Sequence, residues 1–553
     1  MEHISSLLSL TVWNMATGAF VSGILLHQTF LRHGEWHNCA IDMILAYIVL
    51  TSILLFSPAS FGHLIHAPPI TPGLVIKLDL YHFCGIFCSM TLYRAAFHPL
   101  NNFSGPFLAR VSSFYKVNLS RNLRLFEETY KLHQKYGDVV RIGPSELSIA
   151  NPAAVKKVHW PGATPGKGPW YDQGYPRVSL LTTRDKNEHA RLRRIWDRGF
   201  NAKALRDYTP RVRDHTSKLQ EVFDRNLGQT LNITQWFNYY SFDVMGDLAF
   251  GKSFDMLLGG SDHYFLSVLH QNMQNIGYIG PSVWIGPLFM RTPVINSESN
   301  RFWKFISDQV RSRIENPPSL PDVFHWILQG YGDRINTAQG LMNLEAEAEL
   351  IIVAGSDTTA TTLTNSTFEL LRHPEHITKL RTEFDELIDK DMGEITPDDL
   401  AKLPHLNAVI NETLRLHPPV PSGVQRKTPP EGIEFGETYI PGNTIMQIPF
   451  YTLFRDERCF KHPHSFLPER WTTHPELNHD ASVFIPFSNG AYSCVGKQLG
   501  LMELRWVLTM MITQYDISFA PKYDPGSFEK GAMDGFTLIC APLEVLVSRR
   551  DIF

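Results

Sequence analysis

A single cysteine near the carboxyl end of the chain stands in a setting that suits a metal ligand. Cys494 lies in the stretch FSNGAYSCVG at residues 487–496, directly before an amphipathic run from Lys497 to about Tyr515 that predicts a helix. Free N–H groups at a helix entrance favour the thiolate, the form that binds metals. No CxxC, CxxCH or nearby histidine pair accompanies Cys494, which disfavours a zinc cage and a covalently attached haem. A lone thiolate suits a haem iron, and the alternative is a buried free cysteine beside a loop.

A second stretch lies in the middle of a long helical pattern. The pattern runs from Leu344 to Arg372, and the residues AGSDTT at 354–359 interrupt it. Glycine, serine, threonine and aspartate favour other conformations than the helix interior. We therefore expect a function to compensate for the local cost, and the alternative is a loop or a helix start.

Two charged clusters have helical spacing. Glu412 and Arg415 are three residues apart, His189 and Arg193 are four apart, and each pair therefore shares one helix face. In isolation the first would be a surface ion pair and the second, with its neighbouring arginines, a solvated basic face. The segment FLPERW follows at residues 466–471. These clusters indicate a function only together with the other motifs.

Taken together, these stretches resemble the motifs of the cytochrome P-450 superfamily, the haem-thiolate monooxygenases. The resemblance covers everything after about residue 95 and implies a mainly α fold with small β-sheets, with residues 96–553 as the catalytic domain. Tyr492 departs from the pattern FxxGxRxCxG, because the family usually places Arg or His there to pair with a haem propionate. A phenol offers one neutral donor, so that contact should be weaker or replaced. The matching residues are Phe487, Gly490, Cys494 and Gly496.

The resemblance also implies roles at the reacting centre. Cys494 would be the axial ligand of the iron of haem b. Ala354 and Gly355 would leave room for dioxygen on the opposite side, Thr358 would donate a hydrogen bond to it, and Asp357 would relay protons from solvent. Bound dioxygen must be protonated before its O–O bond breaks, while the thiolate pushes electron density from the other face.

Other matched residues would hold the cofactor or the fold. His189, in the place of a family tryptophan, and Arg193 would reach the haem propionates, and Arg426 could offset the missing arginine at Tyr492. A buried triad, costly to break, would hold the loop before the cysteine without a catalytic task. Its members are Glu412, Arg415 and Arg470.

The first 95 residues read as a membrane anchor. Residues 4–26, 39–57 and 74–93 are candidate transmembrane helices. Arg32 follows the first and Arg94 the third, which predicts a lumenal amino terminus and a cytoplasmic catalytic domain. The alternative is one anchor followed by buried hairpin helices. Resemblance to fungal microsomal members implies a multi-pass protein of the endoplasmic reticulum membrane.

Composition limits the remaining possibilities. The chain has 553 residues, of which 43% are hydrophobic and 12% aromatic, so disorder is excluded. A formal charge of −4 gives no general attraction for nucleic acid. Six cysteines without framework spacing suit a reducing compartment. Aromatic residues between His159 and Leu181, and a turn at Asp534–Leu538, are the segments that the resemblance places over a substrate pocket.

These observations predict a monooxygenase of secondary metabolism that inserts one atom of O₂ into a hydrophobic small molecule. Electrons would come from NADPH through a separate NADPH–cytochrome P-450 reductase, because the chain shows no GxGxxG βαβ unit. One rival is a haem-thiolate isomerase or dehydratase without O₂ activation; such proteins commonly lack the threonine. Another is a haem-binding membrane sensor or electron carrier without turnover, which needs no proton relay.

Overall fold

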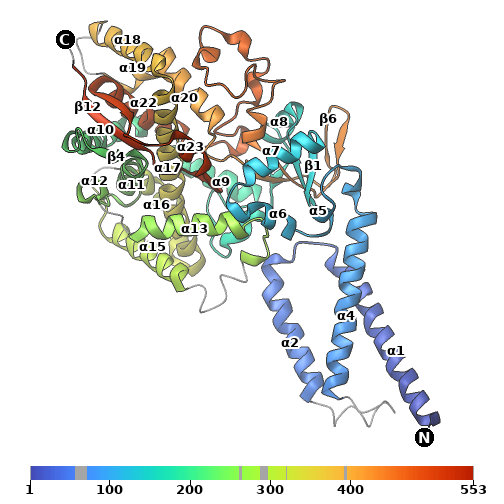
Figure 1. Cartoon of the computed structure of the whole chain (residues 1–553). Coiled ribbons are helices and arrows are strands. Elements are labelled where there is room, and N and C mark those ends of the chain that lie inside the picture. The colour runs from blue at the N-terminus through green and yellow to red at the C-terminus, as the bar shows by residue number, and fades with distance from the viewer. Residues whose placement is uncertain are drawn as a thin grey trace.

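The computed structural model describes residues 2–56, 71–260, 264–286, 297–318, 321–390 and 395–551. Helices dominate these residues, and the strands form small sheets of two, two, three and five strands (Figure 1). The predicted mainly α fold with small β-sheets is therefore confirmed.

Three helices project from one side of the large helical domain that the rest of the chain forms (Figure 1). They are α1 (Glu2–Leu26), α2 (Ala40–Phe56) and α4 (Pro72–Leu92), which match the three predicted spans closely. Residue 57, the last of the second span, lies outside the described residues. In the part of the chain that the structure describes, the helix Pro72–Phe97 is long and apolar enough to cross a bilayer, and His37–Ile53 is a shorter apolar helix.

Two glycines let α1 and α4 pack closely together. A Cβ atom on Gly23 would lie 2.1 Å from the carbonyl oxygen of His82, and one on Gly85 would lie 2.1 Å from that of Phe20. Only glycine permits so close an approach of the two backbones, as is common between membrane helices. In contrast, α2 packs loosely and exposes a run of large apolar side chains, namely Ile44, Leu45, Ile48, Val49, Leu50 and Ile53.

The long helix α17 (Ala338–Arg372) runs through the middle of the large domain (Figure 1). It packs against α11 (Ile233–Phe250), α20 (Pro404–Leu416) and α22 (Lys497–Gln514). Helix α11 is apolar on nearly every side, and a helix of that kind must be enclosed by others. These helices build most of the main hydrophobic core.

The other helices surround this centre, and their ends follow sequence signals. Asn151 caps α8 by accepting from the backbone N–H of Ala153, with Pro152 at the first helical position. Gly137 ends α7 with φ +93°, as its C-cap signal predicts. The bounds are α5 (Phe107–Val111), α6 (Phe114–Leu119), α7 (Leu125–Tyr136), α8 (Pro152–His159), α9 (Lys186–Gly199), α10 (Ala202–Arg225), α12 (Met256–Gly259), α13 (Tyr264–Ile279), α15 (Ser297–Glu315), α16 (Val323–Tyr331), α18 (Pro374–Lys390), α19 (Pro397–Lys402), α21 (Phe450–Leu453) and α23 (Pro525–Lys530).

The largest sheet has the strand order β1-β2-β8-β5-β3. Strands β1 (Val139–Gly143) and β2 (Glu146–Ile149) form an antiparallel hairpin, and β2 pairs in parallel with β8 (Ile445–Gln447). The pairing of β3 with β5 brings two distant segments of the chain together. The remaining strands are β3 (Gly166–Lys167), β4 (Thr230–Asn232), β5 (Gln425–Lys427), β6 (Ile433–Phe435), β7 (Thr438–Ile440), β9 (Tyr515–Phe519), β10 (Met533–Gly535), β11 (Thr537–Ile539) and β12 (Glu544–Arg549).

Candidate active site

The loop before α22 is closed around the cysteine. The backbone N–H of Cys494 donates to the carbonyl of Phe487 at 2.8 Å, which joins the two ends of the loop. Gly490 has φ +67°, and a Cβ atom there would lie 2.8 Å from the carbonyl oxygen of Trp160, so only glycine fits. Gly496 has an ordinary φ of −79°, but a Cβ atom on it would lie 3.9 Å from the Cys494 sulfur. The first glycine therefore shapes the loop and the second keeps space beside the sulfur.

The Cys494 thiol is accessible, yet the protein surrounds it closely. Burial raises the pKa of the thiol, while the backbone N–H groups of Gly496 and Lys497 and the charge of Arg193 act to lower it. The helix entrance thus opposes the effect of burial without overcoming it. Because metals bind the thiolate, a bound iron would have to displace the proton.

Helix α17 continues without a break through residues 354–359. The Thr358 hydroxyl donates to the carbonyl of Ala354 at 2.9 Å, and the Ser356 hydroxyl donates to that of Ile352 at 2.7 Å. These internal bonds satisfy the small polar side chains inside the helix, which removes much of the expected cost. Ala354 is exposed and Thr358 half-buried, although most of the helix is buried, so these two border an accessible space.

Gly355 and Asp357 lie on other faces of α17. A Cβ atom on Gly355 would lie 2.6 Å from the side chain of Met245, so this glycine lets α11 approach. The buried Asp357 accepts a long hydrogen bond from the Thr537 hydroxyl at 3.4 Å, and its Oδ1 lies 3.6 Å from Nε2 of His270. Asp357 borders a cavity of about 330 Å³ that is lined mainly by polar residues.

The ring of Tyr492 lies among basic groups. The Arg426 guanidinium is 4.7 Å from the ring centroid, Lys167 Nζ is 5.2 Å from it, and the His189 ring meets it edge-on at 4.7 Å. Arg426 also donates to the Tyr171 hydroxyl at 3.2 Å. Burial, together with the charges of Lys167 and Arg426, lowers the pKa of His189 to about 4. His189 is therefore neutral at pH 7.

Arg193 lies one turn beyond His189 on α9 and is already engaged. Its Nη1 donates to the carbonyl of Ser493 at 2.6 Å, and its Nε donates to Asp197 at 2.8 Å. The guanidinium therefore ties α9 to the residue before Cys494. The structure places His189 in the cluster around Tyr492, but Arg193 against the cysteine loop.

Comparison with known proteins identifies the family. The cytochrome P-450 family model matches residues 107–547. A cytochrome P-450 monooxygenase of Fusarium pseudograminearum is 43% identical over 540 residues, covering 96% of this chain and 97% of the relative. Tryprostatin B 6-hydroxylase of Aspergillus fumigatus is 38% identical over 541 residues, covering 97% and 96%.

The chain belongs to the cytochrome P-450 family. It is accordingly an oxidoreductase, a monooxygenase that uses haem b, O₂ and electrons from a redox partner. The relatives are fungal cytochrome P-450 enzymes of similar length, and a further one from Eupenicillium brefeldianum is 45% identical over 480 residues, covering 87% of this chain and 97% of that relative. The resemblance inferred from the motifs is confirmed.

The basic cluster of this cytochrome P-450 fits the propionates of haem. Lys167 and Arg426 are 5% and 2% exposed, and in the described part of the chain neither makes an ion pair with a carboxylate. Lys167 donates instead to the carbonyls of Leu180 and Leu181, and Nε of Arg426 has no partner. Burial and then the charge of Arg426 hold the pKa of Lys167 well below its usual range. The two propionate carboxylates of haem would supply the ion-pair partners that Lys167 and Arg426 lack.

Lys167 is a site residue that the sequence did not reveal. It belongs to the two-residue strand β3, and the antiparallel pairing of β3 with β5 sets it opposite Arg426. The only local signal was one lysine within a stretch rich in glycine, proline and aromatic residues. Such a signal cannot be told from a surface lysine, because the partner lies 259 residues further along the chain.

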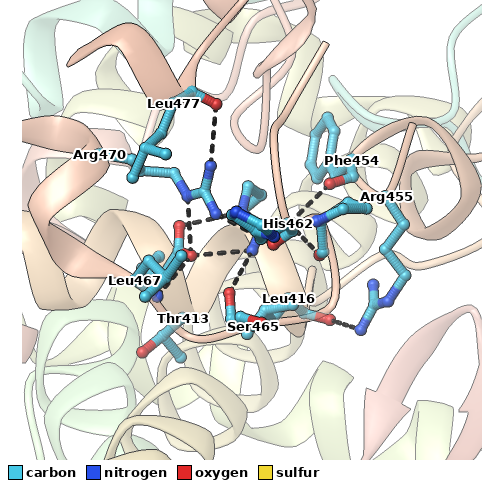
Figure 2. A network of polar contacts seen from close by, with 12 residues as sticks. Thr413, Leu416, Phe454, Arg455, His462, Ser465, Leu467, Arg470 and Leu477 are labelled. Carbon is cyan, nitrogen blue, oxygen red and sulfur yellow. Dashed lines mark hydrogen bonds and ion pairs between the residues drawn. The ribbon is translucent and has the colours of Figure 1, made fainter. Parts of the chain in front are cut away.

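The predicted triad of Glu412, Arg415 and Arg470 comes together in the interior. All three side chains are fully buried, with Glu412 Oε1 2.8 Å from Nη2 of Arg415 and 3.0 Å from Nε of Arg470. Figure 2 shows Arg470 reaching the backbone carbonyl of Leu477, and Arg415 likewise donates to backbone carbonyls of the neighbouring loops. One carboxylate and two guanidinium groups thus hold the segment 454–477 in place. The carbonyls belong to Phe454, Lys461, His462, Pro463, Ser465 and Leu477.

Proposed function

We propose that this cytochrome P-450 hydroxylates a hydrophobic small molecule of secondary metabolism while anchored in the endoplasmic reticulum membrane, with electrons from NADPH through NADPH–cytochrome P-450 reductase. The arrangement of two core helices carries the proposal. Cys494 precedes α22, and Ala354 and Thr358 lie on α17, and all three are accessible within an otherwise buried centre. The helices approach at Gly500, where a Cβ atom would lie 3.7 Å from the Thr359 hydroxyl.

The residues of the site would act on opposite sides of the cofactor. Haem, when bound through Cys494, supplies the oxygen chemistry. The Thr358 hydroxyl can give its hydrogen bond to a ligand only by releasing the carbonyl of Ala354. Asp357 borders the polar cavity and can exchange a proton with solvent there. Lys167 and Arg426 would hold the propionates, and neutral His189 would add a donor beside them.

Aromatic contacts support an apolar substrate. Trp170, in the segment that the resemblance places over the pocket, stacks on Phe536 at the tip of the β10–β11 turn, with 4.5 Å between the ring centroids. Phe536 has φ +80°, which is rare for a residue with a side chain. The relative in Aspergillus fumigatus is named for hydroxylation, and this supports the same reaction type here.

The anchor supports a multi-pass topology. Helix α2 is apolar and exposed, which argues against the alternative in which it is a buried hairpin. The segment between α1 and α2 contacts the catalytic domain through Glu35 and His37, so the end of α1 lies on the same side as that domain. The amino terminus would then be lumenal. Glycosylation acceptor sites placed before α1 should be used, and those placed at residues 32–34 should not.

The reaction can be tested with purified full-length protein, the reductase and NADPH. A metabolite panel is screened for the absorbance shift that accompanies loss of iron-bound water, and each ligand is then assayed for hydroxylated product. Thr358→Ala should retain haem while oxygen insertion gives way to peroxide release. Unchanged product yield in this variant, or no hydroxylation of any ligand that shifts the spectrum, would count against the proposal.

A further inference from the structure

The short connection between α1 and α2 is bonded to the catalytic domain. Glu35 in this connection contacts Arg184 at 2.6 and 3.1 Å and Lys427 at 2.7 Å. His37 Nε2 lies 2.8 Å from Oδ2 of Asp172, and Arg184 also pairs with Asp172. These five residues, named here the anchor clamp, join the membrane anchor to three separate segments of the domain.

The charges of the anchor clamp are balanced. Burial would raise the pKa of Glu35, but hydrogen bonds from Arg184 and Lys427 outweigh it and lower the pKa to about 2. Glu35 therefore stays charged at any physiological pH. Its carboxylate, His37 and Asp172 could together hold a metal ion by spacing, but Arg184 and Lys427 already supply the positive charge.

Asp172 connects the anchor clamp to the segment that the resemblance places over the substrate pocket. It belongs to a 3₁₀ helix over Pro169–Gly174, which also contains Trp170 and Tyr171. Trp170 stacks on Phe536, and its backbone N–H donates to Gln425 Oε1 at 2.8 Å. Tyr171 accepts from Arg426. This one short helix thus contacts the anchor, the C-terminal turn and the basic cluster.

Side-chain contacts do much to fix this short helix, and Gln173 Nε2 adds a bond to the carbonyl of Gly280 at 3.1 Å. A 3₁₀ helix of six residues has weak internal bonding, and its first residue is Pro169. Its backbone bonds to flanking residues are those of Tyr171 N–H to Gly168, Tyr175 N–H to Asp172 and Arg177 N–H to Gly174. Its position therefore depends on the side-chain contacts at its two faces, of which the anchor clamp provides one.

We propose that Glu35 and His37 are positioning residues for the turn at Pro169–Gly174, so that the membrane anchor itself orders the cover of the substrate pocket. The inference rests on the proposed function, because the turn covers a pocket only if a substrate binds beneath it. Neither residue touches the reacting centre. Loss of the anchor clamp should therefore weaken substrate binding and leave the turnover of bound substrate nearly unchanged.

The test compares Glu35→Gln with a matched control in the full-length protein in lipid nanodiscs. The control is Asp308→Asn, which removes an acid from an exposed ion pair with Lys304 on α15. Hydrogen exchange of the ferric protein without substrate is measured over residues 166–178. We expect exchange in Glu35→Gln to be roughly three- to tenfold faster than in wild type, since the pairs are only partly exposed, and unchanged in the control.

Steady-state kinetics provides the second measurement. KM should rise roughly three- to tenfold in Glu35→Gln with kcat within about twofold of wild type, and Glu35→Asp should recover part of the loss. Lys427→Met should show a similar change, and the double variant should add little to either single one because both remove the same contact.

Three results would overturn the inference. They are exchange in Glu35→Gln equal to that in Asp308→Asn, faster exchange with an unchanged KM, or a fall in kcat without a change in KM. The exchange measurement needs no turnover, so it stands apart from the proposed reaction. If the wild-type protein hydroxylates nothing, the proposed function fails whether or not the anchor clamp orders the turn.

Discussion

Replacing Glu412 by glutamine should loosen the segment that leads to Cys494. The carboxylate accepts from Nε and Nη2 of Arg415, Nε of Arg470, the backbone N–H of Leu467 and Nε1 of Trp471, at 2.8 to 3.0 Å. Glutamine keeps one acceptor oxygen and turns an N–H₂ group towards these donors. It also leaves two guanidinium groups buried without an anion.

The structure sets the size of the effect. Removing one partner of a buried ion pair costs about 3–5 kcal/mol, and the 0% exposure of all three charged side chains favours the full amount. An exposed pair such as Glu128 with Lys131 contributes about 0–1 kcal/mol, so Glu128→Gln is the matched control. The free energy of unfolding of a domain is about 5–15 kcal/mol, so the Glu412 variant should lose a large share of it.

Thermal unfolding of the purified full-length protein, with haem content as a second readout, checks this prediction. We expect the apparent midpoint of Glu412→Gln to fall by at least about 4 °C and haem content to drop, with Glu128→Gln close to wild type. If Glu412→Gln unfolded at the same temperature as its control and kept full haem, the triad would not be holding the cysteine loop.

Further changes test the site and its charges. Lys167→Met should release haem roughly tenfold faster to a haem-accepting protein, because a buried charged contact is lost; an unchanged release rate would exclude a propionate at Lys167. Gly490→Ala should destabilise the chain by about 1–3 kcal/mol in a denaturant titration, because φ is +67° and its Cβ would press on a carbonyl; a stability equal to wild type would show that the loop can move aside. Burial raises the pKa of Glu347 to about 7 from 4.5, so between these pH values the folded protein binds one proton more than the unfolded chain. The resulting contribution of about 3 kcal/mol to the free energy of unfolding is lost as pH rises through this window. Stability should therefore fall more steeply between pH 5 and 7 in wild type than in Glu347→Gln, and equal slopes would contradict the shift.

Motifs close in sequence revealed much of the site. The cysteine loop needs only residues 487–496, and the polar stretch at 354–359 stands out because it conflicts with the helix around it. Helical spacing placed Glu412 with Arg415, and apolar length marked the three N-terminal helices. Each of these signals is local, so a single sequence carries it.

Contacts between distant segments were decided by the tertiary structure alone. Lys167 faces Arg426 because β3 pairs with β5, and Arg193 donates to the carbonyl of Ser493, 300 residues away. The contact of Glu35 with Lys427 joins residues 392 apart. No periodicity encodes such pairs, since they depend on how whole helices and strands pack. The sequence by itself determined the motifs and the family, and it predicts the iron ligand; the packing of the chain decided which charges meet.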